Sequence, residues 1–89
     1  MAAAQLQVHV VSADNEVYSG VATMVVARTV DGEIGILPGH EPMLAILAGG
    51  DVRVTGNDGS KVTARADGGF LSVENNNVSI VASYAELVD

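Results

Sequence analysis

The feature of the sequence that most restricts its fold is a series of short apolar segments that alternate with polar residues and stop at turn-forming residues. In residues 6–11 (LQVHVV), Leu6, Val8 and Val10 fall on one side, as in a strand with one buried face. Turns rich in Gly, Asn and Asp follow at short intervals, and no helical period occurs before the last few residues. We expect strands at residues 6–11, 17–19, 22–28, 34–37, 43–47, 52–55, 62–66, 70–74 and 78–82. This spacing predicts an all-β sandwich or barrel.

Composition limits what the chain can be. It has 89 residues, of which 48% are apolar, so we expect a single domain over residues 1–89 with one modest core. The chain has no cysteine, which excludes disulfides and thiolate zinc sites. A net charge of −7 repels phosphate backbones, so we expect no nucleic-acid partner. The apolar runs are far shorter than the ~20 residues that span a bilayer, and no basic region precedes one at the N-terminus, so we expect a soluble chain without a secretion signal or direct membrane insertion.

The last seven residues, 83–89 (SYAELVD), are the one segment that suggests a helix. Ser83 followed by Glu86 matches the capping-box pattern, in which each side chain bonds a free backbone N–H at a helix start. The pattern predicts that a helix begins at Ser83, although the chain stops before two turns are complete.

Residues with catalytic or ligand-binding chemistry are sparse. The two histidines are His9 and His40, and neither has the neighbouring nucleophile that a catalytic triad requires. We expect His9 on the polar face of its strand, solvated or hydrogen-bonded locally. Residues 57–60 (NDGS) bear a faint likeness to a calcium loop but lack its further carboxylates, so we expect a hairpin turn. The sequence therefore predicts no catalytic, metal or cofactor site.

One segment, residues 32–42 (GEIGILPGHEP), is not explained by strands and simple turns. Pro38 and Pro42 each fix one backbone angle, and Gly39 permits conformations that other residues avoid. We expect a rigid loop that presents its histidine and its second glutamate outward. Two interpretations remain from the residues alone: a turn in which the histidine bonds the nearby backbone, or a surface shaped for another protein.

At this loop the sequence resembles the N-terminal β-sandwich domain of the ε subunit of bacterial rotary ATP synthases. The family's glycine-acidic-aliphatic-glycine strand, its proline-glycine-histidine and its proline-aliphatic run match residues 32–44. Two further blocks agree in order, residues 8–20 and residues 68–82, and the resemblance covers about residues 6–86. It implies a flattened ten-stranded β-sandwich. The family's C-terminal helical hairpin is absent from this sequence, so inhibition and nucleotide binding are not carried over.

The resemblance also implies a non-catalytic rotor subunit that couples rotation of the membrane-embedded c ring to the γ stalk. It implies no cofactor and no small-molecule substrate, and a place at the cytoplasmic face of the bacterial plasma membrane, reached through the complex. Contact with γ would come from Pro38, Gly39, His40, Glu41 and Pro42. Contact with the polar loops of the c ring would come from Thr29, Asp31, Gly32, Glu33 and Gly35. The acidic Glu33 would suit the basic and polar loops of a ring.

A different class of function stays open: a free-standing β-sandwich that binds a small ligand or a metal through His40, Glu41 and Glu33. Such a module needs these side chains to line one concave pocket. A rotor subunit instead needs an apolar docking surface beside His40. The shape and chemistry of that face distinguish the two.

Overall fold

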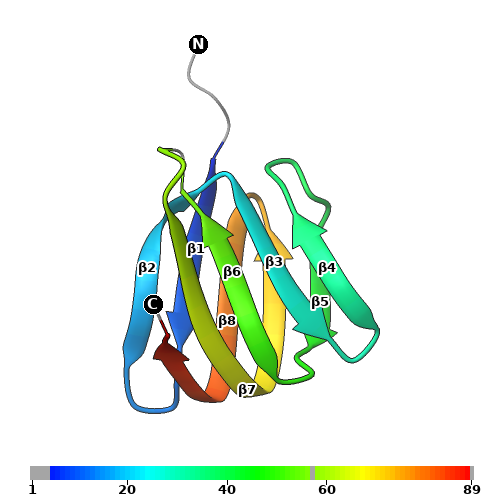
Figure 1. The fold of residues 1–89 in the computed structure, drawn as a ribbon. Coiled ribbons are helices and arrows are strands. Elements are labelled where there is room, and N and C mark those ends of the chain that lie inside the picture. The colour runs from blue at the N-terminus through cyan, green and yellow to red at the C-terminus, as the bar shows by residue number, and fades with distance from the viewer. Residues whose placement is uncertain (1–4, 57, 89) are drawn as a thin grey trace.

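The computed structural model describes residues 5–56 and 58–88, and all regular structure in that part of the chain is β-strand. The eight strands are β1 (Leu6–Val11), β2 (Glu16–Ala22), β3 (Met24–Thr29), β4 (Gly32–Ile36), β5 (Met43–Ile46), β6 (Gly50–Thr55), β7 (Lys61–Glu74) and β8 (Asn77–Leu87). They form two layers, and β3 and β6 lie in front of β1 and β8 in Figure 1. The expected β-sandwich is confirmed. No helix able to cross a membrane occurs in the described residues.

The long strand β7 joins the two layers. Strands follow the order β2-β1-β8-β7-β6-β3-β4, and β5 pairs separately with β7. β1 and β8 run parallel, whereas the other pairs run antiparallel. Residues 61–66 of β7 pair with β6, and residues 70–73 pair with β5. Figure 1 shows β7 turning from the front layer into the back layer between these two segments.

Residues 5–56 and 58–88 contain eight strands rather than the ten implied by the resemblance. β7, with 14 residues, and β8, with 11, each run through both layers without interruption. Each therefore takes the place of two shorter strands, one in each layer. The sequence predicted that residues 62–66 and 70–74 are separate strands. Gly68, with φ of +67°, bends one strand instead of ending it, because β8 pairs with β7 on both sides of the bend.

One apolar core fills the space between the layers. Leu6, Val8 and Val10 of β1 are completely buried, as their alternation predicted. The core also contains Ala22, Val25, Ala27, Ile36, Leu47, Val52, Val54, Ala64, Ala66, Leu71, Val73, Val78, Ile80 and Ala82. Burying a Val, Leu or Ile side chain contributes about 1.5–3 kcal/mol, so packing stabilises this cysteine-free chain.

The helix predicted from Ser83 is wrong, because residues 83–87 form the last part of β8. Cross-strand pairing with β7, including Arg65 with Glu86, satisfies the backbone groups that a capping box would have served. The Ser83 hydroxyl donates instead to the carbonyl oxygen of Gly68 at 2.8 Å. Asp89, the last residue of the predicted helix, lies outside the described residues.

The break between β2 and β3 falls at Thr23 rather than at residues 20–21, which separate the predicted strands 17–19 and 22–28. The backbone N–H of Thr23 donates to the carbonyl oxygen of Thr55 at 2.8 Å, and this bond ties the crossing point to β6. A contact between distant parts of the chain therefore sets the boundary between β2 and β3. Gly20 lies within β2, where it is paired with Val8 of β1.

Candidate functional site

The loop between β4 and β5, residues 37–42, is a tight turn held by its own backbone. The N–H of His40 donates to the carbonyl oxygen of Leu37 at 3.1 Å, and Gly39 has φ of +88°. His40 Nδ1 donates to the carbonyl oxygen of Glu41 at 2.7 Å. The N–H of Gly39 donates to Asn76 Oδ1 at 2.7 Å, which ties the loop to the β7–β8 turn. The predicted rigid loop has these specific causes.

His40 and Glu33 do not share a site. A shallow depression of about 440 Å³ at the loop is lined by Gly39, His40, Glu41, Pro42, Asn75 and Asn76. Glu33 lies at the far end of β4 and lines a different depression. Across residues 5–56 and 58–88, no group of three or more potential ligands could hold a metal ion. The structure therefore does not support the ligand- or metal-binding alternative.

The β3–β4 turn carries the other predicted contact residues. Thr29 is buried, and its hydroxyl donates to the carbonyl oxygen of Gly32 at 2.8 Å while accepting the N–H of Asp31 at 3.2 Å. Its side chain thus shapes the turn rather than facing outward. Asp31, Gly32 and Gly35 are exposed. Val30, at the tip, is 62% exposed and was missed by sequence reasoning, because turn residues carry no periodic signal.

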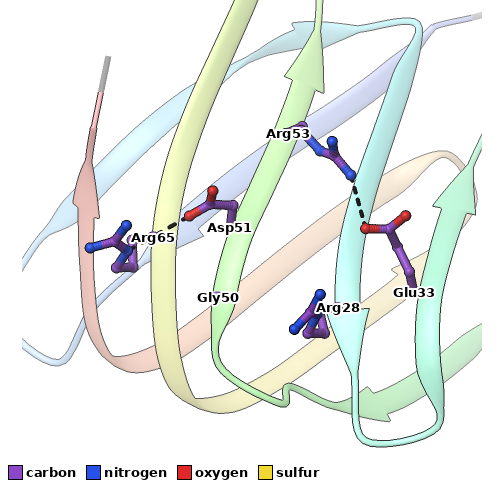
Figure 2. A pocket seen from close by; sticks show the side chains of 6 residues that line it. All are labelled: Arg28, Glu33, Gly50, Asp51, Arg53 and Arg65. Carbon is purple, nitrogen blue, oxygen red and sulfur yellow. Dashed lines mark hydrogen bonds and ion pairs between the residues drawn. The ribbon is translucent and has the colours of Figure 1, made fainter.

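Glu33 already has a cationic partner. Arg53 Nη2 donates to Glu33 Oε2 at 2.9 Å, and both side chains are more than half exposed (Figure 2). An exposed pair of this kind stabilises a fold by less than about 1 kcal/mol. A ring loop that meets Glu33 would therefore meet a carboxylate shared with an arginine, and not an isolated negative charge.

An exposed apolar row crosses the outer face of the back layer and was not predicted. Ile46 of β5 pairs with Phe70 of β7, Phe70 pairs with Val81 of β8, and Val81 pairs with Val11 of β1. Ile46 is 62% exposed, Phe70 43% and Val81 38%, and Leu44 beside them is 72% exposed. We call Leu44, Ile46, Phe70 and Val81 the apolar row. One signal was available: both faces of the segment MLAIL are apolar, although a half-exposed strand needs only one.

His9 lies on the polar face of β1, as predicted. Its Nδ1 atom is 3.3 Å from Ser19 Oγ and 3.5 Å from Glu16 Oε1, both from β2. This local hydrogen bonding accounts for the residue without any catalytic role.

In the β6–β7 turn, the carboxylate of Asp58, which a cation would need as a ligand, accepts hydrogen bonds from Ser60 of the same turn. The Ser60 hydroxyl donates to Asp58 Oδ1 at 2.6 Å and the Ser60 N–H donates to the same atom at 3.0 Å. The predicted hairpin turn is confirmed for residues 56 and 58–60. Asn57, the first residue of the calcium-like motif, lies outside the described residues.

These two hydrogen bonds, the hydroxyl first, hold the pKa of Asp58 below its ordinary value. A depressed pKa adds stability above the pKa of the unfolded chain, and that stability is lost as the pH falls through the folded value. We expect Ser60→Ala to raise the pKa of Asp58, as measured by NMR titration of its carboxyl carbon. An unchanged pKa in Ser60→Ala would show that the hydroxyl bond does not form in solution.

Comparison with known proteins identifies the family to which the chain belongs. A family model described as the ATP synthase Delta/Epsilon chain beta-sandwich domain matches residues 5–88. The ATP synthase epsilon chain of Micrococcus luteus is 55% identical over 86 residues, which are 97% of this chain and 94% of that relative. The ATP synthase epsilon chain of Streptomyces avermitilis is 49% identical over 87 residues, which are 98% of this chain and 70% of that relative.

The fold matches a solved structure as well. A chain in the mitochondrial ATP synthase of Euglena gracilis, solved with OSCP, F1 and the c-ring, is similar with a TM-score of 0.88 and 28% identity. The match covers 98% of this chain and 56% of the Euglena chain, so this chain spans about half of that one. By sequence and by fold, the chain belongs to the Delta/Epsilon family of ATP synthase β-sandwich domains.

Proposed function

We propose that the chain couples the c ring to the γ subunit in the rotor of an ATP synthase, docking γ on the apolar row and the His40 loop. Family membership supplies the general role, that of a non-catalytic ε-type subunit of the central stalk. Such a subunit works within a membrane-associated complex, and we place it at the cytoplasmic face of the bacterial membrane. It performs no chemistry of its own, and its function lies in its surfaces.

The apolar row is the observation that supports the γ contact. Its four large side chains cross three neighbouring strands on an outer sheet face, where water would otherwise solvate polar residues. An exposed apolar strip with an aromatic residue near its centre has the composition of the core of a protein interface. The His40 loop runs directly into β5, so Pro38–Pro42 would form the edge of the same contact.

The position of β5 supports a two-sided subunit. Its first residue, Met43, follows the His40 loop. At its other end, the carbonyl oxygen of Ile46 accepts the N–H of Val30, from the β3–β4 turn, at 2.9 Å. The turn proposed to meet the c ring is thus hydrogen-bonded to the strand that bears the proposed γ surface. A stiff link of this kind passes torque between two partners without a flexible joint.

The test is a calorimetric titration of the chain with the cognate γ subunit, using wild type, His40→Ala and Glu33→Lys. We expect wild type to bind, and His40→Ala to bind about 5- to 10-fold more weakly, because truncation loosens the turn at the edge of the contact. We expect Glu33→Lys to bind γ like wild type, since its partner is the ring.

A second measurement tests the ring side. In reconstituted vesicles, Glu33→Lys is expected to lower ATP-driven proton pumping while γ binding remains intact. If a folded wild-type chain does not bind γ, the proposed role is wrong for this chain. If Glu33→Lys lowers γ affinity as much as His40→Ala does, the assignment of the two surfaces is wrong.

A further inference from the structure

All four basic residues of this acidic chain lie on one face. Arg28 is on β3, Arg53 is on β6, and Lys61 and Arg65 are on β7. Each is exposed and alternates with residues that face the core, so each points outward on the front layer. We call these four residues the arginine face. The apolar row lies on the outer side of the other layer, so the two surfaces are separate.

Three guanidinium groups surround a shallow depression on this face. It has a volume of about 370 Å³ and is lined by Arg28, Glu33, Gly50, Asp51, Arg53 and Arg65 (Figure 2). Arg53 forms an ion pair with Glu33 (Nη2 to Oε2, 2.9 Å), and Arg65 forms one with Asp51 (Nε to Oδ1, 3.7 Å). Of these three arginines, Arg28 alone has no ion pair within the described part of the chain, so it is the one open to a partner.

The side chains around the depression fit a protein better than a small anion. Glu33 and Asp51 line the depression and already pair with two of its three arginines, so a multiply charged phosphate would find only one arginine, Arg28, without an ion pair in the described residues. On the neighbouring strand β8, outside the lining of the depression, Tyr84 is 53% exposed and donates to Glu86 at 2.6 Å, and Glu86 lies opposite Arg65 in the strand pairing. The charge of Arg65 partly offsets the rise in the Tyr84 pKa that this bond causes. Arginine and tyrosine are residue types enriched at protein interfaces.

The spacing of the strands indicates the shape of the partner. β6 lies between β3 and β7, so the backbones at Arg28 and Arg65 are about 10 Å apart, two strand spacings. Two turns of an α-helix advance about 10.5 Å, so carboxylates seven residues apart on one helix face reach both guanidinium groups. Arginine also binds a carboxylate with two parallel hydrogen bonds, which a lysine cannot do.

We propose that the arginine face docks an acidic helix of a partner protein, with one carboxylate on Arg28 and a second near Arg65. This surface and its ligand go beyond the rotor role. The depression shares Glu33 with the proposed ring contact, but the proposed ligand binds through Arg28 and Arg65. Lys61 lies toward the start of β7 and does not line the depression, which makes it a matched control for a change of charge.

The probe is a synthetic helical peptide with two glutamates seven residues apart, and the comparison peptide has glutamine at both positions. Binding to the isotope-labelled full chain is followed by NMR. We expect shifts at residues 28, 50–53 and 65 with the glutamate peptide and none with the glutamine peptide. We expect Arg28→Glu to weaken binding at least ~10-fold, Arg28→Lys to weaken it less, and Lys61→Glu to change it less than ~2-fold.

Three results would overturn the proposal. The first is that the wild-type chain does not bind the glutamate peptide. The second is that Lys61→Glu weakens binding as much as Arg28→Glu does, because binding would then reflect non-specific charge attraction. The third is that inorganic phosphate produces the same shifts and displaces the peptide, which makes the face a small-anion site. The NMR spectrum of each variant shows whether it is folded. We expect Arg28→Glu to bind γ with wild-type affinity whatever the result with the peptides, because the apolar row lies on the other layer.

Discussion

Gly69→Ala is expected to prevent folding or to lower the free energy of unfolding by more than about 3 kcal/mol. A Cβ atom on residue 69 would overlap the carbonyl oxygen of Val81 and would lie 2.6 Å from the Cα atom of Ala82. Both atoms belong to the backbone of β8, which is paired to β7 here and cannot move aside without breaking the sheet. Urea denaturation followed by circular dichroism measures the change.

A matched control separates this clash from the general cost of replacing a glycine. Gly59, in the β6–β7 turn, has φ of +86°. Among the described residues, no group other than its two neighbours in the sequence lies within 4 Å of the point that a Cβ atom would occupy. Gly59→Ala should therefore cost only about 1 kcal/mol, the cost of backbone strain. A Gly69→Ala variant as stable as Gly59→Ala would mean that β7 and β8 do not approach this closely.

Phe70→Glu is expected to weaken γ binding by about 100-fold or more while leaving the fold intact. Phe70 lies in the middle of the apolar row, between Ile46 and Val81, and a buried charge without a partner disrupts the core of an interface. Its side chain is already 43% exposed in the free chain, so the glutamate remains solvated before binding. Calorimetric titration with γ measures the loss of affinity.

Tyr84→Glu is the control for this variant, because it replaces another exposed aromatic residue with glutamate on the opposite layer. We expect Tyr84→Glu to bind γ within about 2-fold of wild type. Equal losses in the two variants would show that added negative charge, and not the apolar row, controls binding. An unchanged affinity in Phe70→Glu would move the γ contact away from the back layer.

Much of the fold follows from local pattern. The alternation in residues 6–11 placed Leu6, Val8 and Val10 in the core, and the polar turns marked most strand ends, because a strand with one wet face must alternate. The stiffness of the His40 loop also followed from its residues, since Pro38 and Gly39 restrict or permit backbone angles wherever they occur. The family was recognisable from the same segment.

Other features depended on contacts between residues distant in the sequence. The capping-box pattern at Ser83 and Glu86 was a valid local signal, but pairing with β7 offered every backbone group a partner, and the strand formed instead. Gly68 resembled a strand end, yet β8 continues on both sides of it and makes it a bend.

The surfaces show the same division most clearly. The sequence by itself determined which residues are apolar, charged or stiff, and from the alternation which of them face outward. Only the tertiary structure placed Ile46, Phe70 and Val81 in one row, because strand register and not sequence order decides which side chains become neighbours. Register likewise carried the four basic residues, spread over residues 28–65, onto one face of the sandwich.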